Sequence, residues 1–159
     1  SAALLSGAGE APSVSPEDPR SQAPARARSH VVEDHADLVG AVAACADQVA
    51  GAWETPPTDR AGVVEPLRGV MAESGVLERL PSLLASAVAA AGYELQASPV
   101  AAPPYVAVTS VGPVCRATVA DGRLVVTFEL FELDRSGDAA TYRRRDCLPG
   151  ESVVVELRD

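Results

Sequence analysis

A predicted β-hairpin between residues 113 and 133 limits the fold of this chain more than any other feature. The run PVCRATVADGRLVVTFELFEL carries β-branched and aromatic residues on both sides of Asp121-Gly122. An Asp-Gly pair favours a two-residue type I′ turn, because both central positions of that turn need a positive φ angle. A turn at this pair predicts a register in which directly opposed residues share one face of the sheet. The expected pairs are Ala120 with Arg123, Val119 with Leu124, Ala117 with Val126 and Cys115 with Phe128.

The same alternation predicts one apolar face and one mixed face for this hairpin. The apolar face holds Cys115, Ala117, Val119, Leu124, Val126, Phe128 and Leu130. The mixed face holds Arg116, Thr118, Val125, Thr127 and Glu129, followed by Phe131 and Leu133. A slip of one residue would place charged side chains in the core, so the pattern specifies which face is buried. We therefore expect the face with Phe128 to be dry and Arg116 to lie on the other face.

A helix is predicted from His30 to Trp53. Ser29 is a suitable N-cap, and Pro56-Pro57 should stop the helix shortly after Trp53. The apolar positions recur four and three residues apart, which is typical of one helix face. They are Val32, His35, Val39, Val42, Ala46, Val49 and Trp53. This face is the best candidate to cover the apolar side of the hairpin.

Residues 58–92 are expected to form three short helical pieces. A proline inside a helix costs about 3 kcal/mol, so Pro66 and Pro81 favour new starts over continuous helices. Gly92 is placed for a left-handed C-cap.

Short strands are predicted on either side of the hairpin, at residues 93–97, 105–111, 141–145 and 152–158. Helices followed by strands favour an α+β fold, with N-terminal helices packed on one face of a four- to five-stranded antiparallel sheet. Residues 30–159 are therefore expected to form a single α+β domain, helical over 30–92 and mainly strands over 93–159. Residues 1–29 are rich in Pro, Ala and Ser and are expected to be a disordered tail, because they cannot bury enough apolar surface to offset the entropy of ordering.

The composition is strongly acidic. There are 22 acidic residues against 13 basic ones, a net charge of −9, and the sequence holds no lysine, isoleucine or asparagine. Those three residue types have codons rich in A and T, so their absence indicates a GC-rich genome. In composition the chain resembles the small acidic proteins of halophilic archaea, and that resemblance implies a habitat rather than an activity. An actinobacterial origin is the alternative.

The charge and the cysteines exclude or disfavour several classes of function. The negative net charge disfavours a nucleic acid partner, because affinity for phosphate backbones comes mostly from clustered basic residues. No apolar run approaches the roughly 20 residues that span a bilayer, and no signal peptide pattern is present, so a cytoplasmic location is expected. Three cysteines without a C-x-x-C pair predict neither a disulfide framework nor a zinc site. We expect no cofactor and no metal.

The leading functional hypothesis is a non-enzymatic module that associates with itself or with another protein. Val125, Phe131 and Leu133 place apolar side chains on the mixed face of the hairpin. Such residues indicate either a two-sided core or an association surface, which a homodimer could use.

The alternative hypothesis is a site for an anion, a nucleotide or RNA. Its candidate residues are Arg116 on the mixed face and the run Arg143, Arg144 and Arg145, whose guanidinium groups could bind phosphate. The competing interpretation is that these arginines form ion pairs with the nearby Glu129, Glu132 and Asp134.

A third hypothesis is a cysteine-dependent enzyme using Cys147, because the preceding arginines would favour its thiolate. Asp146 opposes that effect. No catalytic constellation is recognisable, and no residue is predicted to be catalytic. His35 and Trp53 are interpreted as core or boundary residues rather than as ligand-binding ones.

Overall fold

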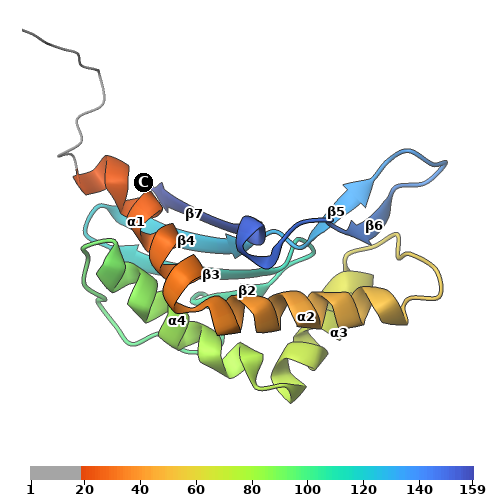
Figure 1. The fold of residues 1–159 in the computed structure, drawn as a ribbon, viewed down its shortest axis with the longest axis horizontal. Helices are drawn as coiled ribbons and strands as arrows, with labels where there is room; N and C mark the ends of the chain where they lie inside the picture. Colours follow the sequence, from red (N-terminus) through yellow and green to blue (C-terminus); the bar gives the residue numbers. More distant parts are fainter. Residues whose placement is uncertain (1–18) are drawn as a thin grey trace, which may run out of the picture.

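The computed structural model of the chain describes residues 19–159 (Figure 1). Four helices come first: α1 (Pro19–Asp34), α2 (Ala36–Ala52), α3 (Ala61–Glu73) and α4 (Val76–Ala90). The strands follow: β2 (Val106–Val108), β3 (Pro113–Val119), β4 (Gly122–Phe128), β5 (Phe131–Asp134), β6 (Thr141–Arg144) and, after the short 3-10 helix η2 (Pro149–Ser152), β7 (Val153–Arg158). The main sheet is antiparallel with the order β2-β3-β4-β7, and β5 pairs with β6 in a second, two-stranded sheet. The predicted α+β fold is confirmed, with the helices packed against one face of the main sheet.

The central hairpin forms, but with a different register from the predicted one. Val119 faces Gly122, Ala117 faces Leu124 and Cys115 faces Val126, so the two turn residues are Ala120 and Asp121. The predicted pairs, such as Ala120 with Arg123, were therefore wrong by two residues. Because this shift is even, the side chains of β3 and β4 keep the faces that were predicted for them.

The position of Gly122 explains the shift. This residue has a φ angle of 139°, and a Cβ atom on it would lie 2.1 Å from the carbonyl oxygen of Arg158. Gly122 therefore serves the close approach of β7 to the first residue of β4, rather than the centre of the turn.

The buried face of the sheet is the one that alternation predicted. Phe128 is fully buried, while Arg116 lies on the opposite face and is partly exposed. β7 extends the apolar face, because Leu157, Val155 and Val153 lie opposite Leu124, Val126 and Phe128. The helices cover this face with the buried side chains of α1, α2, α3 and α4, and together they form one core.

The first helix begins earlier than predicted. α1 starts at Pro19, so the expected tail over residues 1–29 is corrected at its C-terminal end, and Ser29 lies inside the helix rather than at its start. Ala23, Ala27 and Val31 are buried, because their small side chains let α1 lie close against α4 and β7. Residues 1–18 of the predicted tail lie outside the described part of the chain. The predicted continuous helix over residues 30–53 is instead divided at His35 into α1 and α2.

Two prolines do not break the helices as predicted. Pro66 lies inside α3 and Pro81 lies inside α4, so two helices replace the three expected pieces. A proline inside a helix leaves the carbonyl four residues earlier without its N–H donor. For Pro66 that carbonyl belongs to Gly62, and the indole N–H of Trp53 donates to it at 3.3 Å. A side chain from another element thus replaces the missing backbone bond.

The end of α4 agrees with its sequence. Gly92 has a φ angle of 93°, and the backbone N–H of Tyr93 donates to the carbonyl of Val88 at 3.1 Å, as in a Schellman motif. The short strand predicted over residues 93–97 is absent; this segment is an irregular connection toward β2.

The chain leaves the main sheet after Phe128. The backbone N–H groups of Leu130 and Phe131 both donate to the carbonyl of Val111, which turns the chain into the β5–β6 sheet. The hairpin strand expected to continue to Leu133 is therefore divided. Because of this turn, the ring of Phe131 enters the main core, where it lies 5.6 Å from the ring of Trp53.

Candidate anion-binding site

The face of the main sheet that points away from the helices carries most of its polar side chains. Arg116 on β3, Arg123 on β4 and Arg158 on β7 lie on this open face. Side chains directly opposite each other, or two residues apart on one strand, point to the same face of a sheet. Arg123 lies opposite Arg158 and opposite Thr118, and Arg116 lies two residues before Thr118.

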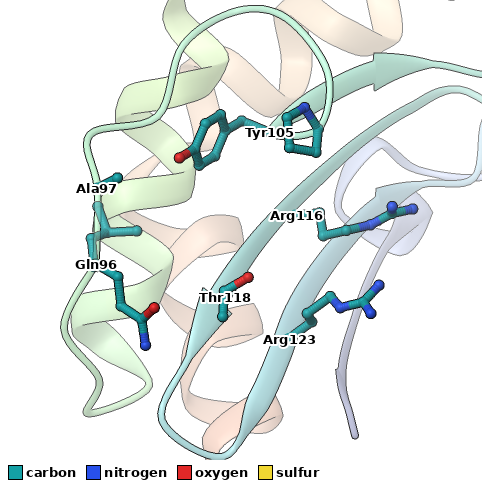
Figure 2. A pocket seen from close by; sticks show the side chains of 8 residues that line it. Gln96, Ala97, Tyr105, Arg116, Thr118 and Arg123 are labelled. Carbon is teal, nitrogen blue, oxygen red and sulfur yellow. The ribbon is translucent and has the colours of Figure 1, made fainter.

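A cavity of about 580 Å³ lies on the β2–β3 side of the open face, between the strands and the connection that follows α4 (Figure 2). Its lining consists of Leu95, Gln96, Ala97, Pro104, Tyr105, Arg116, Thr118 and Arg123. No aspartate or glutamate belongs to this lining, although the chain as a whole carries a net charge of −9. The cavity is thus a local positive site on an acidic protein.

The two arginines of the cavity come from neighbouring strands. Thr118 lies directly opposite Arg123, and Arg116 lies two residues before Thr118 on the same face of β3. Diagonal neighbours of this kind are separated by about 7 to 8 Å. Figure 2 shows both arginine side chains extending in the same direction, with their guanidinium groups turned away from Tyr105 and Gln96, which lie on the other side of Thr118.

Among the described residues, Arg116 and Arg123 have no side-chain partner. Within residues 19–159, no hydrogen bond or ion pair joins Arg116 or Arg123 to another side chain. Two acids line a second hollow of the open face together with Arg116, and both have other partners: Glu156 pairs with Arg158, and Glu129 lies 3.6 Å from Arg145. Two positive charges are therefore available to a ligand, and guanidinium groups suit phosphate and carboxylate oxygens.

The predicted arginine run lies apart from this cavity. Arg143 pairs with Glu132 at 2.7 Å, and Arg144 lies 3.0 Å from Asp47 and donates to two backbone carbonyls. Arg145 donates to the carbonyl of Glu129 at 2.8 Å. The run therefore connects β6 to its surroundings.

One expected partner of the run is engaged with its own loop. The Asp134 carboxylate accepts hydrogen bonds from the hydroxyl and the backbone N–H of Ser136, and these bonds lower its pKa. Of the sequence-predicted anion residues, Arg116 alone lines the cavity, and Arg123 is the arginine that the prediction missed. The same alternation that placed Arg116 on the open face could have found Arg123.

The residues proposed for an association surface are mostly covered. Val125 and Phe131 are each 1% exposed, whereas Leu133 is 39% exposed. Phe131 belongs to the helix-covered core, because the chain turns after Phe128, and not to a second core on the mixed face. Val125 lies on the open face between Arg116 and Glu156, so its neighbours on that face cover it.

A histidine contact that the sequence did not indicate joins α1 to α4. The Nδ1 atom of His30 lies 2.7 Å from a carboxylate oxygen of Asp34, and its Nε2 atom contacts the hydroxyl oxygen of Ser86. With the Nδ1 proton donated to Asp34, Nε2 is left to accept from Ser86. The three residues are thus arranged like a catalytic triad, with Ser86 in the place of the nucleophile, His30 in that of the base and Asp34 in that of the acid that orients the base. Ser86 lies in the middle of α4, however, where backbone N–H groups bond within the helix and cannot stabilise an oxyanion. The contact is therefore interpreted as a clamp between helices.

His35 lies beside that clamp at the junction of α1 and α2. Its ring is 5.2 Å from the ring of His30 in an edge-to-face arrangement. Burial, with a smaller contribution from the nearby His30, lowers the pKa of His35. A neutral imidazole at this junction agrees with the predicted boundary role.

The three cysteines are free thiols in different settings. Cys45 and Cys115 are buried, and Cys147 is partly exposed. Burial raises the pKa of Cys115 to about 12, so its thiol stays protonated and unreactive at neutral pH.

Within residues 19–159, no three His, Cys, Asp or Glu side chains lie together in a way that could hold a metal ion. In the same described part of the chain, no helix has the length and apolar content needed to cross a bilayer.

Comparison with known proteins relates the chain to a family of domains. A family model described as "Domain of unknown function (DUF7988)" matches residues 25–158, which include most of α1 and every later helix and strand. No curated protein and no solved structure shows significant similarity to the chain.

Proposed function

The chain belongs to the DUF7988 family, and we propose that it binds a small organic anion in the cavity lined by Arg116 and Arg123. The carrying observation is that Arg116 and Arg123 line a cavity without any acidic residue and have no side-chain partner within residues 19–159. Elsewhere in the described chain, several arginines bond acids or carbonyls, as Arg143 and Arg28 do. An anion would supply the partners that Arg116 and Arg123 lack.

Titration calorimetry of the full chain with inorganic phosphate and with benzoate tests this proposal. A hydrogen bond to a charged group contributes about 1.5 to 3 kcal/mol, so we expect Arg116→Gln and Arg123→Gln each to weaken binding of a bound anion roughly 10- to 100-fold. Arg135→Gln removes an equal charge from an exposed loop outside the cavity and should leave affinity unchanged. Equal losses in all three variants would refute a site at this cavity.

A second candidate function is self-association through the open sheet face. Val114, Val125 and Val154 lie on that face beside both signs of charge, including Glu156 and Arg158. A mixed, half-apolar surface of this kind suits a second copy of itself, since each acid can meet an arginine of the partner. Light scattering would show a dimer that Val154→Glu converts to a monomer without loss of the fold. A monomer at every concentration in the parent chain would remove this candidate.

A further inference from the structure

The size of the cavity shows that a simple anion would fill only part of it. One water molecule in the liquid takes about 30 Å³, whereas this cavity measures about 580 Å³. Cavities for organic ligands range over about 300 to 1,000 Å³. A ligand that fills this space therefore has an organic body in addition to its charged group.

The charges of the cavity favour two negative charges on that ligand. Arg116 and Arg123 each carry a full positive charge, and no acidic residue in the lining offsets it. A carboxylate supplies one negative charge. A phosphate monoester carries between about 1.5 and 2 negative charges at pH 7, with three acceptor oxygens for the two guanidinium groups and the hydroxyl of Thr118.

The wall opposite the arginines favours a flat, apolar body with polar edges. Tyr105, Pro104 and Leu95 contribute apolar surface to the lining, and the exposed Gln96 adds an amide that both donates and accepts hydrogen bonds (Figure 2). Aromatic side chains bind nucleobases by stacking without requiring one particular base. Charge lies along one side of the cavity, and apolar surface lies along the other.

We propose that the ligand is a phosphate monoester of a planar heterocycle, of the class of nucleoside monophosphates. Its phosphate is held by Arg116, Arg123 and Thr118, and its ring lies against Tyr105 within reach of Gln96. This inference rests on the proposed function, because it names the ligand class of the same cavity. A single-stranded RNA is the less suitable occupant, since its internal phosphates are diesters with one charge each and the chain carries −9 overall.

Calorimetry of the full chain with four probes tests the two halves of the ligand separately. The probes are adenosine monophosphate, ribose 5-phosphate, adenosine and a short single-stranded RNA. Stacking on an aromatic side chain should make adenosine monophosphate bind at least about tenfold more tightly than ribose 5-phosphate. Since the second phosphate pKa lies near 6, affinity for both phosphates should rise between pH 5 and pH 7. Sulfate, whose charge is constant over this range, serves as the control.

Two matched variants assign the contacts. Arg123→Gln should lower the affinities for adenosine monophosphate and for ribose 5-phosphate by the same factor. Tyr105→Leu should weaken adenosine monophosphate about tenfold and leave ribose 5-phosphate unchanged. Tyr105 also packs against the core, so its replacement could affect the fold. Gln96 is exposed, and Gln96→Ala therefore gives a second test of the ring contact. This variant should lose affinity for adenosine monophosphate and keep its affinity for ribose 5-phosphate.

The outcomes separate this inference from the proposed function. Equal affinities for adenosine monophosphate and ribose 5-phosphate, or affinity that does not change with pH, would overturn the ligand class while the anion site stands. Tighter binding of RNA than of adenosine monophosphate would overturn the proposal that the ligand is a phosphate monoester. If phosphate, benzoate and all four probes fail to bind, both the ligand class and the anion site are refuted.

Discussion

Cys115 lies on the buried face of β3, directly opposite Val126, where no solvent reaches its sulfur. Removing a thiolate from water is unfavourable, so burial raises the pKa of this thiol from 9.0 to about 12. Between these two values the folded protein keeps a proton that the unfolded chain has lost. The stabilisation from the neutral buried thiol is therefore complete below pH 9 and is lost as the pH rises toward 12.

Denaturant titrations at a series of pH values check this expectation. The free energy of unfolding of the parent chain should fall more steeply between pH 9 and pH 12 than that of Cys115→Ala. Both proteins share the same tyrosines, so the difference between their slopes reports Cys115. Parallel curves for the two proteins would contradict the raised pKa.

Gly122 combines a positive φ angle with a close backbone contact, and it should not tolerate a side chain. A Cβ atom there would meet the carbonyl of Arg158 at 2.1 Å. We expect Gly122→Ala to lower the free energy of unfolding by at least about 2 kcal/mol, because backbone strain and overpacking add. Gly69→Ala in α3 is the matched control: nothing lies within 4 Å of its added methyl, so it should stabilise the helix by about 0.5 to 1 kcal/mol. Thermal or denaturant unfolding gives both values, and a neutral Gly122→Ala would disprove the crowding.

Helix α3 tolerates an internal proline because Trp53, the residue that follows α2, supplies a hydrogen-bond donor to the helix. The indole of Trp53 reaches the Gly62 carbonyl that Pro66 cannot bond, and its ring also packs on Phe131. One side chain therefore connects the end of α2, the first turn of α3 and β5. Since the donor comes from a different element, no pattern within α3 could have indicated it.

A double-mutant cycle on Trp53 and Pro66 measures this coupling. Trp53→Phe should cost about 1 to 3 kcal/mol beyond its packing loss, because the Gly62 carbonyl is left unpaired. In a Pro66→Ala background, the new backbone N–H can bond that carbonyl, so the same Trp53→Phe change should cost less. Additive effects in the cycle would show that the indole bond contributes nothing.

The net charge of the chain affects the stability of the whole folded protein. With 22 acids and 13 arginines, repulsion between like charges opposes the compact state. Salt shortens the range of this repulsion, from about 10 Å at 0.1 M to about 3 Å at 1 M. Added salt should therefore stabilise the folded protein.

We expect the thermal midpoint of unfolding to rise between 0.05 and 1 M sodium chloride. The triple variant Glu54→Gln, Glu73→Gln and Asp138→Asn removes three exposed acids and changes the net charge from −9 to −6, so it should show a smaller rise. Scanning calorimetry gives both midpoints. A midpoint that falls with salt would mean that screened ion pairs, such as Arg143 with Glu132, outweigh the general repulsion.

The sequence by itself determined which side of the sheet is dry and that helices precede strands. Both follow from local periodicity, which an even register shift leaves intact, so Phe128 was placed correctly even though its predicted partner Cys115 was wrong. Arg116 was identified as a candidate for the same reason, and Arg123 could have been.

The tertiary structure alone decided the features that need partners far away in the chain. Gly122 meets Arg158, the Gly62 carbonyl meets Trp53, and the connection bearing Gln96 forms the far wall of the cavity. Sequence periodicity reports which way a side chain points from its own backbone. It holds no information on what another segment brings to the other side, because that depends on how the elements pack.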